Sequence, residues 1–300
     1  MHDVILFVPP RGNHPIATMF GNLNVVLREH GLNSKVMPVE EWSPRESCSI
    51  SVGLGGDKPA TTRGRVTGNI IRHQKATGNR HIVVDRGYIY KRQEYWSVGW
   101  DALNGRANFC NSNMDHRRIE EWGISMRPWK LNPHGFVLFC LQLPWDAAVN
   151  NTHYPTFVRD ATEKILKETG RDIILRNHPL ISTGGCSQLP IANEYRAEVD
   201  KLLRNDRVRL SHSVSIEDDF DKAWCAVAYN SNSTVDATLY GVPSFVADRG
   251  SMTWDISRHD LKIEEPITPN RHQWLCDLSY TQWSVDEVSE AIPFKQLGVI

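Results

Sequence analysis

A run of hydroxyl and amide side chains at residues 229–234 (YNSNST) separates an apolar segment from a segment with helical character. A helix N-terminus offers unpaired backbone N–H groups and a partial positive charge. Ser and Asn side chains there add hydrogen bonds to a phosphate or ribose, although they also cap helices where no ligand binds. Because the run is longer than a cap requires, it predicts a phosphate or ribose site formed by Ser231, Asn232, Ser233 and Thr234.

A second polar group, Arg176-Asn177-His178-Pro179, follows the expected strand Asp172–Leu175. Ligands of open α/β sheets bind beyond the carboxyl ends of parallel strands. Arg176 and His178 suit a diphosphate at that place, and Pro179 would fix the turn. A solvated loop with incidental charge is the alternative interpretation.

The segment 63–130 is strongly basic, with thirteen Lys and Arg against six Asp and Glu, which is a net charge of +7. Its aromatic residues alternate with arginines, a combination that suits a polyanion with stackable bases. The sequence therefore predicts an acceptor surface, with a solvated basic face over an ordinary core as the alternative. Its expected members are Arg86, Tyr88, Arg92, Trp96, Trp100 and Arg106.

The composition excludes several classes of protein. A hydrophobic fraction of 40% in 300 residues is that of an ordered globular chain of about two domains. The net charge of −1 argues against a uniformly basic protein only, because the rest of the chain carries −8. No apolar run is long enough to span a membrane, and the apolar start favours a buried strand over a signal peptide. We therefore expect a cytoplasmic chain whose six cysteines are reduced.

Strand-like and helix-like segments alternate along the chain, which predicts α/β layers with parallel sheets. Apolar strands are expected near Val4–Pro9, Ser49–Leu54, His81–Asp85, Phe136–Leu141 and Cys225–Ala228. Residues 86–130 are expected to be irregular. We place a boundary near residue 132, which gives two Rossmann-like domains, 1–131 and 132–300.

The two polar motifs together resemble a known pattern. The pattern is similar to the donor-binding domain of GT-B glycosyltransferases. It consists of Arg176-Asn177-His178-Pro179, then Ser231, Ser233 and Thr234, with Gly241 and Pro243 closing the helix. The closest likeness is to the capsular-polysaccharide type, and it covers roughly residues 132–250. The sequence departs from that pattern in having Arg-Asn before His-Pro, where Lys-Pro is commoner.

The resemblance implies two Rossmann-like domains facing a cleft, with the donor in the second and the acceptor in the first. It implies a nucleotide sugar such as UDP-glucose as co-substrate, with no cofactor and no metal held by a DxD motif. Asp219-Phe220-Asp221 has the letters of DxD, but it lies at an expected helix start, where acids complement the dipole. The leaving diphosphate would be stabilised by Arg176, His178 and helix N–H groups.

An inverting transfer also needs a general base for the acceptor hydroxyl. The candidates are His14, Asp85 and Asp101, each near an expected strand end or loop of the first domain. A turn, a salt bridge or a helix cap is the alternative role of each. The commonest hydrolase, kinase and zincin motifs are absent from the sequence.

The leading hypothesis is therefore a glycosyltransferase with its acceptor on the basic first domain. One version glycosylates a hydroxymethylated pyrimidine in double-stranded DNA, as bacteriophage DNA-modifying enzymes do, and would work in the host cytoplasm. The alternatives are a capsule or lipopolysaccharide-type transferase that acts on a glycan, and a non-catalytic nucleic-acid-binding protein on a GT-B scaffold. The oligomeric state is left open.

Overall fold

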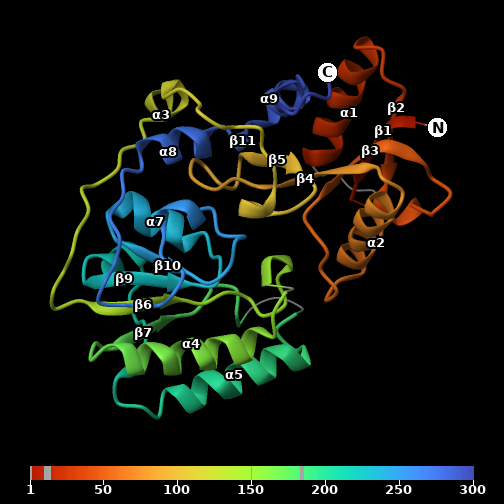
Figure 1. Ribbon diagram of the computed structural model, residues 1–300. Helices are drawn as coiled ribbons and strands as arrows, with labels where there is room; N and C mark the ends of the chain where they lie inside the picture. The colour runs from red at the N-terminus through yellow and green to blue at the C-terminus, as the bar shows by residue number, and fades with distance from the viewer. Residues whose placement is uncertain (1, 10–14, 150, 183–185) are drawn as a thin grey trace. The chain divides into compact units, whose positions relative to one another are not determined.

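The computed structural model describes residues 2–9, 15–149, 151–182 and 186–300. The chain divides into two compact units, the first formed by Met1–Gly123 with His272–Ile300 and the second by Ile124–Arg271. Each unit is built around one mainly parallel sheet with helices on its faces (Figure 1). The predicted α/β class with two Rossmann-like units is confirmed.

The first unit contains a six-stranded sheet of order β11-β5-β4-β3-β1-β2. Its strands are β1 (His2–Val8), β2 (Ser34–Pro38), β3 (Cys48–Leu54), β4 (Arg80–Arg86), β5 (Trp96–Trp100) and β11 (Gln282–Trp283). Its helices are α1 (Pro15–Glu29), α2 (Thr62–Ala76), α3 (Arg117–Glu121), α8 (His272–Ser279), α9 (Val285–Ser289) and α10 (Ile292–Gln296), with short 3₁₀ turns at Val39–Glu41 and Asn104–Arg106.

Alternation along β1 divides the core of this unit between the two faces of its sheet. Val4 and Leu6 belong to a cluster with α1 and the C-terminal helices. Ile5 and Phe7 face the other way and pack with Ile70 of α2. The buried continuous run of β1 therefore matches a strand covered on both faces.

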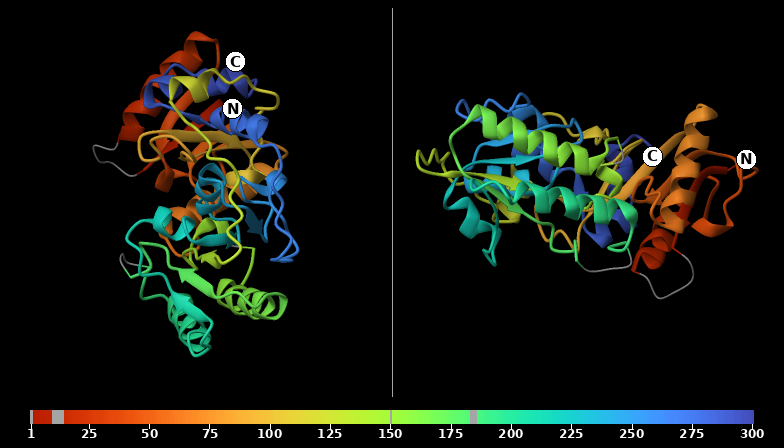
Figure 2. Two further views of the ribbon diagram at one scale, coloured as in Figure 1. Left: turned by 90° about the vertical axis from the view of Figure 1, so that its left-hand side faces the viewer. Right: turned by 90° about the horizontal axis from the view of Figure 1, so that it is seen from below.

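The second unit contains a parallel sheet of order β10-β9-β6-β7-β8. Its strands are β6 (Phe136–Cys140), β7 (Ile173–Arg176), β8 (Val208–Leu210), β9 (Ala223–Ala228) and β10 (Ser244–Val246). Its helices are α4 (Tyr154–Glu168), α5 (Pro190–Leu202), α6 (Ile216–Phe220) and α7 (Ser233–Tyr240), with 3₁₀ turns at Ala147–Val149 and Trp254–Ile256. Helices α4 and α5 lie side by side on one face and α7 lies on the other (Figures 1 and 2).

The C-terminal segment His272–Ile300 belongs to the first unit, whereas the sequence pattern predicted a second domain of residues 132–300. Strand β11 pairs antiparallel with β5. Val288 and Phe294 are fully buried in the core that α1 also fills. The reason for the difference is physical: an apolar helical pattern shows that a segment needs a core, but not which core.

Strand β5 differs from the irregular structure expected for residues 86–130. Trp96–Trp100 pairs antiparallel with β4, and all five of its residues are buried. The Trp100 indole N–H donates to the carbonyl of Leu297 at 3.2 Å. The arginines and tyrosines around this short segment concealed its β character.

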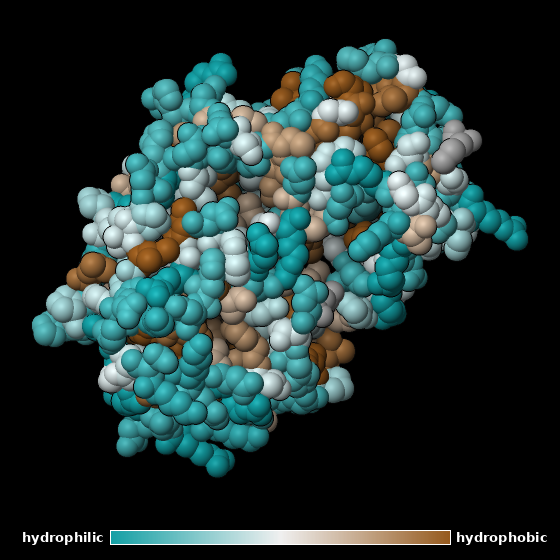
Figure 3. Space-filling view, viewed as in Figure 1, coloured by the Kyte–Doolittle hydropathy of each residue, from teal (hydrophilic) through white to brown (hydrophobic). Residues whose placement is uncertain are grey.

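Most of the surface in Figure 3 is hydrophilic, and the apolar side chains form separate groups. The large apolar side chains that are exposed in the described residues are scattered along the chain, at Val25, Leu131, Leu180, Val214 and Ile267. No helix in the described part of the chain is long and apolar enough to cross a lipid bilayer.

Candidate functional site

A pocket of about 200 Å³ lies at the carboxyl ends of β6 and β7 in the second unit. Its position follows from the sheet register, because Cys140 at the end of β6 pairs with Arg176 at the end of β7. The pocket brings together parts of both polar motifs. Its lining is formed by Cys140, Leu141, Arg176, Asn177, His178, Pro179, Ile216 and Ser233.

His178 is half-buried at the rim of this pocket. Its Nδ1 accepts a hydrogen bond from the backbone N–H of Leu180 at 3.1 Å. A neutral imidazole that accepts through Nδ1 carries its proton on Nε2. The turn therefore sets the tautomer that can donate a hydrogen bond to an anionic ligand.

Arg176 lines the pocket, but most of its guanidinium is engaged within the unit. It forms an ion pair with Asp219 at 2.6 Å and donates to the Ser211 hydroxyl at 3.1 Å. It also donates to the carbonyls of Ser213 and Val214. Arg176 thus fixes the 211–214 loop, and its charge is balanced by a carboxylate whose side chain is only 5% exposed.

The two acids of the DxD-like sequence have different partners. Asp219 lies in the first turn of α6 and pairs with Arg176. Asp221 is hydrogen-bonded by the Tyr240 hydroxyl, which lowers the pKa of its carboxyl, and it pairs with Lys130 at 3.5 Å. Among the residues that the structure describes, no group of three or more His, Cys, Asp or Glu side chains is arranged to hold a metal ion.

The turn before α7 satisfies much of its own hydrogen bonding. The Ser231 hydroxyl accepts from the N–H of Ser233 at 3.2 Å, and the Ser231 carbonyl accepts from the N–H and the hydroxyl of Thr234. Thr234 is fully buried against Ser251. Ser231 and Thr234 therefore serve as capping and packing residues, while Ser233 faces the pocket. Asn232 is the N-cap residue, and its side chain makes no capping hydrogen bond.

Sequence reasoning missed a buried amide network that joins the ends of three strands. Asn230 accepts from the Gln142 amide through Oδ1 at 2.8 Å, and its N–H donates to Gln142 Oε1 at 3.0 Å. The Asn230 amide also donates to Asp248 at 2.8 Å. Two long-range amide bonds of this kind rigidify the strand ends around the pocket. The available signal was an amide side chain two residues after the apolar strands β6 and β9.

The chain has similar structures among known proteins but no match by sequence. No family model matches the chain, and no curated protein matches it. The structure resembles that of Thermosulfurimonas dismutans KpsC, a beta Kdo 2,7 transferase, with a TM-score of 0.51 and 10% sequence identity over 98% of this chain and 99% of that one. The fold is GT-B.

Two further structures superpose less closely on this GT-B chain. Staphylococcus aureus MnaA, solved with UDP, gives a TM-score of 0.36 at 11% identity and covers 100% of this chain and 98% of that one. The UDP-GlcNAc 2-epimerase of Methanocaldococcus jannaschii gives 0.34 at 10% identity and covers 99% of both chains.

The three general-base candidates of this GT-B chain have different settings. His14 lies outside the described residues. Asp85 is half-buried near the carboxyl end of β4, and its Oδ1 accepts from the backbone N–H of Arg86 at 2.8 Å. Asp101 pairs with Arg80 at 2.7 Å and accepts from the N–H of His81. Asp101 therefore lies at the amino end of β4, away from the strand ends where ligands of such sheets bind.

The aromatic members of the expected acceptor surface are core residues. Tyr88, Trp96 and Trp100 are 3%, 6% and 4% exposed, so they present no open ring to a nucleic-acid base. The Arg86 guanidinium covers the Trp96 ring at 4.3 Å. Trp96 and Trp100 are buried because they lie on β5, and Tyr88 is buried in the segment that joins β4 to β5.

The remaining cations of that surface differ in exposure. Arg86 and Arg106 are exposed, and Arg92 is half-buried. The positive charge of Arg86 and Arg106 therefore lies at the surface, without the predicted stacking platform.

Proposed function

We propose that this chain is a glycosyltransferase that moves a sugar from a nucleotide-sugar donor to an acceptor hydroxyl. The observation that carries the proposal is the pocket at the ends of β6 and β7, where His178 and Ser233 converge within a GT-B fold. Such a pocket, beyond the carboxyl ends of parallel strands, is where nucleotides bind in open α/β sheets. The donor diphosphate would lie between His178 Nε2–H and the Ser233 hydroxyl.

Departure of the nucleoside diphosphate concentrates negative charge on its oxygens as the bond to the sugar breaks. A hydrogen-bond donor held in place before the reaction stabilises that charge at no cost of reorganisation. His178 is such a donor, because the N–H of Leu180 holds its ring and its tautomer. Arg176 holds the 211–214 loop beside the pocket.

The proposed acceptor is an anionic molecule with a free hydroxyl. Its support is the net charge of +7 in residues 63–130. A hydroxymethylated pyrimidine in duplex DNA is one such acceptor and an acidic glycan of the capsule or lipopolysaccharide type is another. Asp85 is the residue we assign as the base in an inverting transfer, and a cytoplasmic nucleotide sugar such as UDP-glucose is the co-substrate.

Donor binding is tested first, by the thermal unfolding midpoint with UDP, GDP and CMP sugars. A ligand bound by the native state alone raises the midpoint. The matched variants are His178→Ala, in the pocket, and His153→Ala, whose exposed ring pairs with Glu194 outside it. The proposal expects a rise with at least one donor class, lost in the first variant and kept in the second.

Transfer is tested next with labelled sugar offered to hydroxymethylated duplex DNA, unmodified duplex DNA and an acidic oligosaccharide. Label on the modified DNA alone identifies the DNA acceptor, and label on the oligosaccharide alone identifies a glycan acceptor. DNA binding with steep salt dependence but no affinity for any donor would instead identify a non-catalytic DNA-binding protein.

A further inference from the structure

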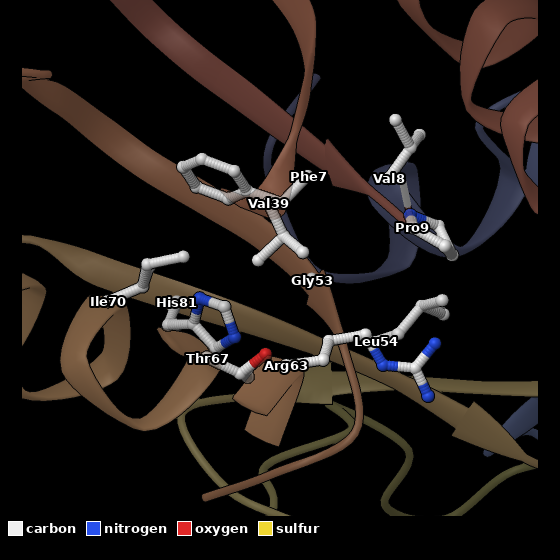
Figure 4. Close-up of a pocket in the computed structure, with 10 residues that line it drawn as sticks. All are labelled: Phe7, Val8, Pro9, Val39, Gly53, Leu54, Arg63, Thr67, Ile70 and His81. Atoms are coloured by element: carbon white, nitrogen blue, oxygen red, sulfur yellow. The ribbon is translucent and has the colours of Figure 1, made fainter. Parts of the chain in front are cut away.

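A second and much smaller pocket lies in the first unit, between the sheet and the N-terminal half of α2 (Figure 4). Its volume of about 10 Å³ is room for a single water-sized group. Apolar side chains form most of its wall, including Phe7, Val39 and Ile70. Polar side chains of His81, Thr67 and Arg63 line it as well.

His81 is the buried polar group of this pocket, with an exposed fraction of 2%. Its Nδ1 shares a hydrogen bond of 2.7 Å with the buried hydroxyl of Ser51. Its Nε2 is buried and has no hydrogen-bond partner among the described residues. Burial lowers the pKa of the ring to about 4, so the imidazole is neutral at neutral pH. An unpaired buried nitrogen of this kind destabilises a fold unless a ligand or water satisfies it.

Gly53 keeps the space beside His81 open. A Cβ at this position of β3 would lie 3.2 Å from His81 Cε1 and 3.6 Å from Nε2. Any larger side chain would therefore fill the place next to the unpaired nitrogen. In Figure 4 the His81 ring and the Thr67 hydroxyl lie on the side of the pocket opposite Phe7 and Val39.

Thr67 and Arg63 extend the polar side of the pocket along α2. The two residues are one helical turn apart, which places their side chains about 6 Å from each other. Thr67 is buried, and Arg63 is exposed in the first turn of the helix. Within the described residues, Arg63 has no ion-pair partner. The N-terminus of this 15-residue helix, capped by Thr61, adds partial positive charge beside Arg63.

We propose that this pocket binds a small hydroxy acid. The ligand's hydroxyl group occupies the enclosed space, where it hydrogen-bonds His81 Nε2 and the Thr67 hydroxyl. Its carboxylate lies outward, beside Arg63 and the N-terminus of α2. The inference goes beyond the proposed function and does not depend on it, because the pocket belongs to the other unit and its test needs no nucleotide sugar.

The test uses nuclear magnetic resonance of the full chain with labelled histidine rings, with the His81 signals assigned through His81→Gln. The probes are 3-hydroxypropionate, propionate, which lacks the hydroxyl, and 1,3-propanediol, which lacks the charge. We expect 3-hydroxypropionate to shift the His81 signals and to bind with about tenfold higher affinity than either control. A tenfold difference corresponds to the loss of one hydrogen bond or one ion contact.

Two variants localise the binding. Gly53→Ala places a methyl group beside Nε2 and is expected to abolish the shift of the His81 signals, while Arg63→Gln is expected to weaken binding of the acid about tenfold and leave that of 1,3-propanediol unchanged. An unchanged His81 signal up to about 100 mM 3-hydroxypropionate would overturn the inference. So would equal affinity for propionate, or full binding by a folded Gly53→Ala protein.

Discussion

At the residue scale, the candidate donor site contains two kinds of side chain. Some line the pocket, and others make hydrogen bonds within the protein that keep the surrounding backbone in place. His178 and Ser233 line the pocket, and the hydrogen bond from the Leu180 N–H to Nδ1 places the proton of a neutral His178 ring on Nε2. Arg176 and Thr234 are mainly engaged within the protein. The sequence placed all four in one functional group, because residue type and spacing do not reveal which hydrogen bonds are already made.

His178→Ala is expected to lower the rate of the proposed sugar transfer by about 100-fold, since it removes the hydrogen-bond donor that we propose for the leaving diphosphate. The unfolding midpoint without ligand should stay near that of the original protein, because the ring is only half-buried. Steady-state transfer kinetics measure the effect, with His153→Ala as the surface control. An unchanged rate in His178→Ala would remove His178 from the mechanism.

Arg176→Ala is expected to lower the free energy of unfolding by about 3–5 kcal/mol, because it leaves the buried Asp219 carboxylate without its partner. Arg176→Ala combined with Asp219→Asn should recover part of that loss, since the uncompensated charge is gone. Urea unfolding of the two single variants and the double variant gives the coupling energy. Additive losses would show that the pair does not hold the loop.

His81 makes the stability of the protein sensitive to acid. Its pKa is lowered from 6.5 to about 4 in the folded state, chiefly because burial disfavours the charged ring. The unfolded chain therefore binds a proton that the folded chain does not bind between these two pH values. The contribution of His81 to the free energy of unfolding is complete above pH 6.5. It decreases as the pH falls, and about 3 kcal/mol has been lost at pH 4.

The comparison with His81→Gln isolates this contribution, since the other histidines are the same in both proteins. The difference between the two unfolding free energies should change by about 3 kcal/mol between neutral pH and pH 4, because only the original protein carries the titrating His81 ring. A constant difference across that range would show that His81 titrates normally in the folded protein.

At the element scale, apolar patterning predicted the central parallel strands well. The expected strands at Val4–Pro9, Ser49–Leu54 and Phe136–Leu141 agree with β1, β3 and β6 to within two residues at each end. Continuous burial on both faces produces a strong pattern of this kind. The two antiparallel strands at one edge of the first sheet were not predicted, because β5 is short and β11 has only two residues.

Helix α7 ends at Gly241, whose φ of +88° favours glycine. A Cβ there would clash with the carbonyl oxygen of Pro128, so a side chain would also force the backbone apart. Gly241→Ala is expected to lower the free energy of unfolding by about 2 kcal/mol or more. Gly170→Ala, where nothing lies within 4 Å, should change it by less than about 0.5 kcal/mol, and equal losses in urea unfolding would contradict this account.

At the scale of the whole molecule, charge and topology were predictable to different degrees. The division of a near-neutral chain into a segment of +7 and a remainder of −8 is read directly from the residues. The return of residues 272–300 to the first unit depends on long-range packing of Trp283, Val288 and Phe294. No local pattern encodes that choice, which is why the predicted domain boundary differs from the observed one.

Packing of the whole molecule also explains why the predicted base-stacking surface is absent at Tyr88, Trp96 and Trp100. The mixture of arginine and aromatic residues was interpreted as a surface for stacked bases, but packing places Tyr88, Trp96 and Trp100 in the core. The charge still supports an anionic acceptor, because arginines cannot be buried without partners as readily as aromatic rings. Residue type along the chain therefore predicted an excess of positive charge but not which side chains are exposed.

The most direct test of the central claim is a crystal structure of the chain with the nucleotide sugar that most raises its unfolding midpoint. We predict that the donor diphosphate lies in the pocket at the ends of β6 and β7, within hydrogen-bonding distance of His178 Nε2 and the Ser233 hydroxyl. A nucleotide sugar bound elsewhere, with this pocket empty, would contradict the account.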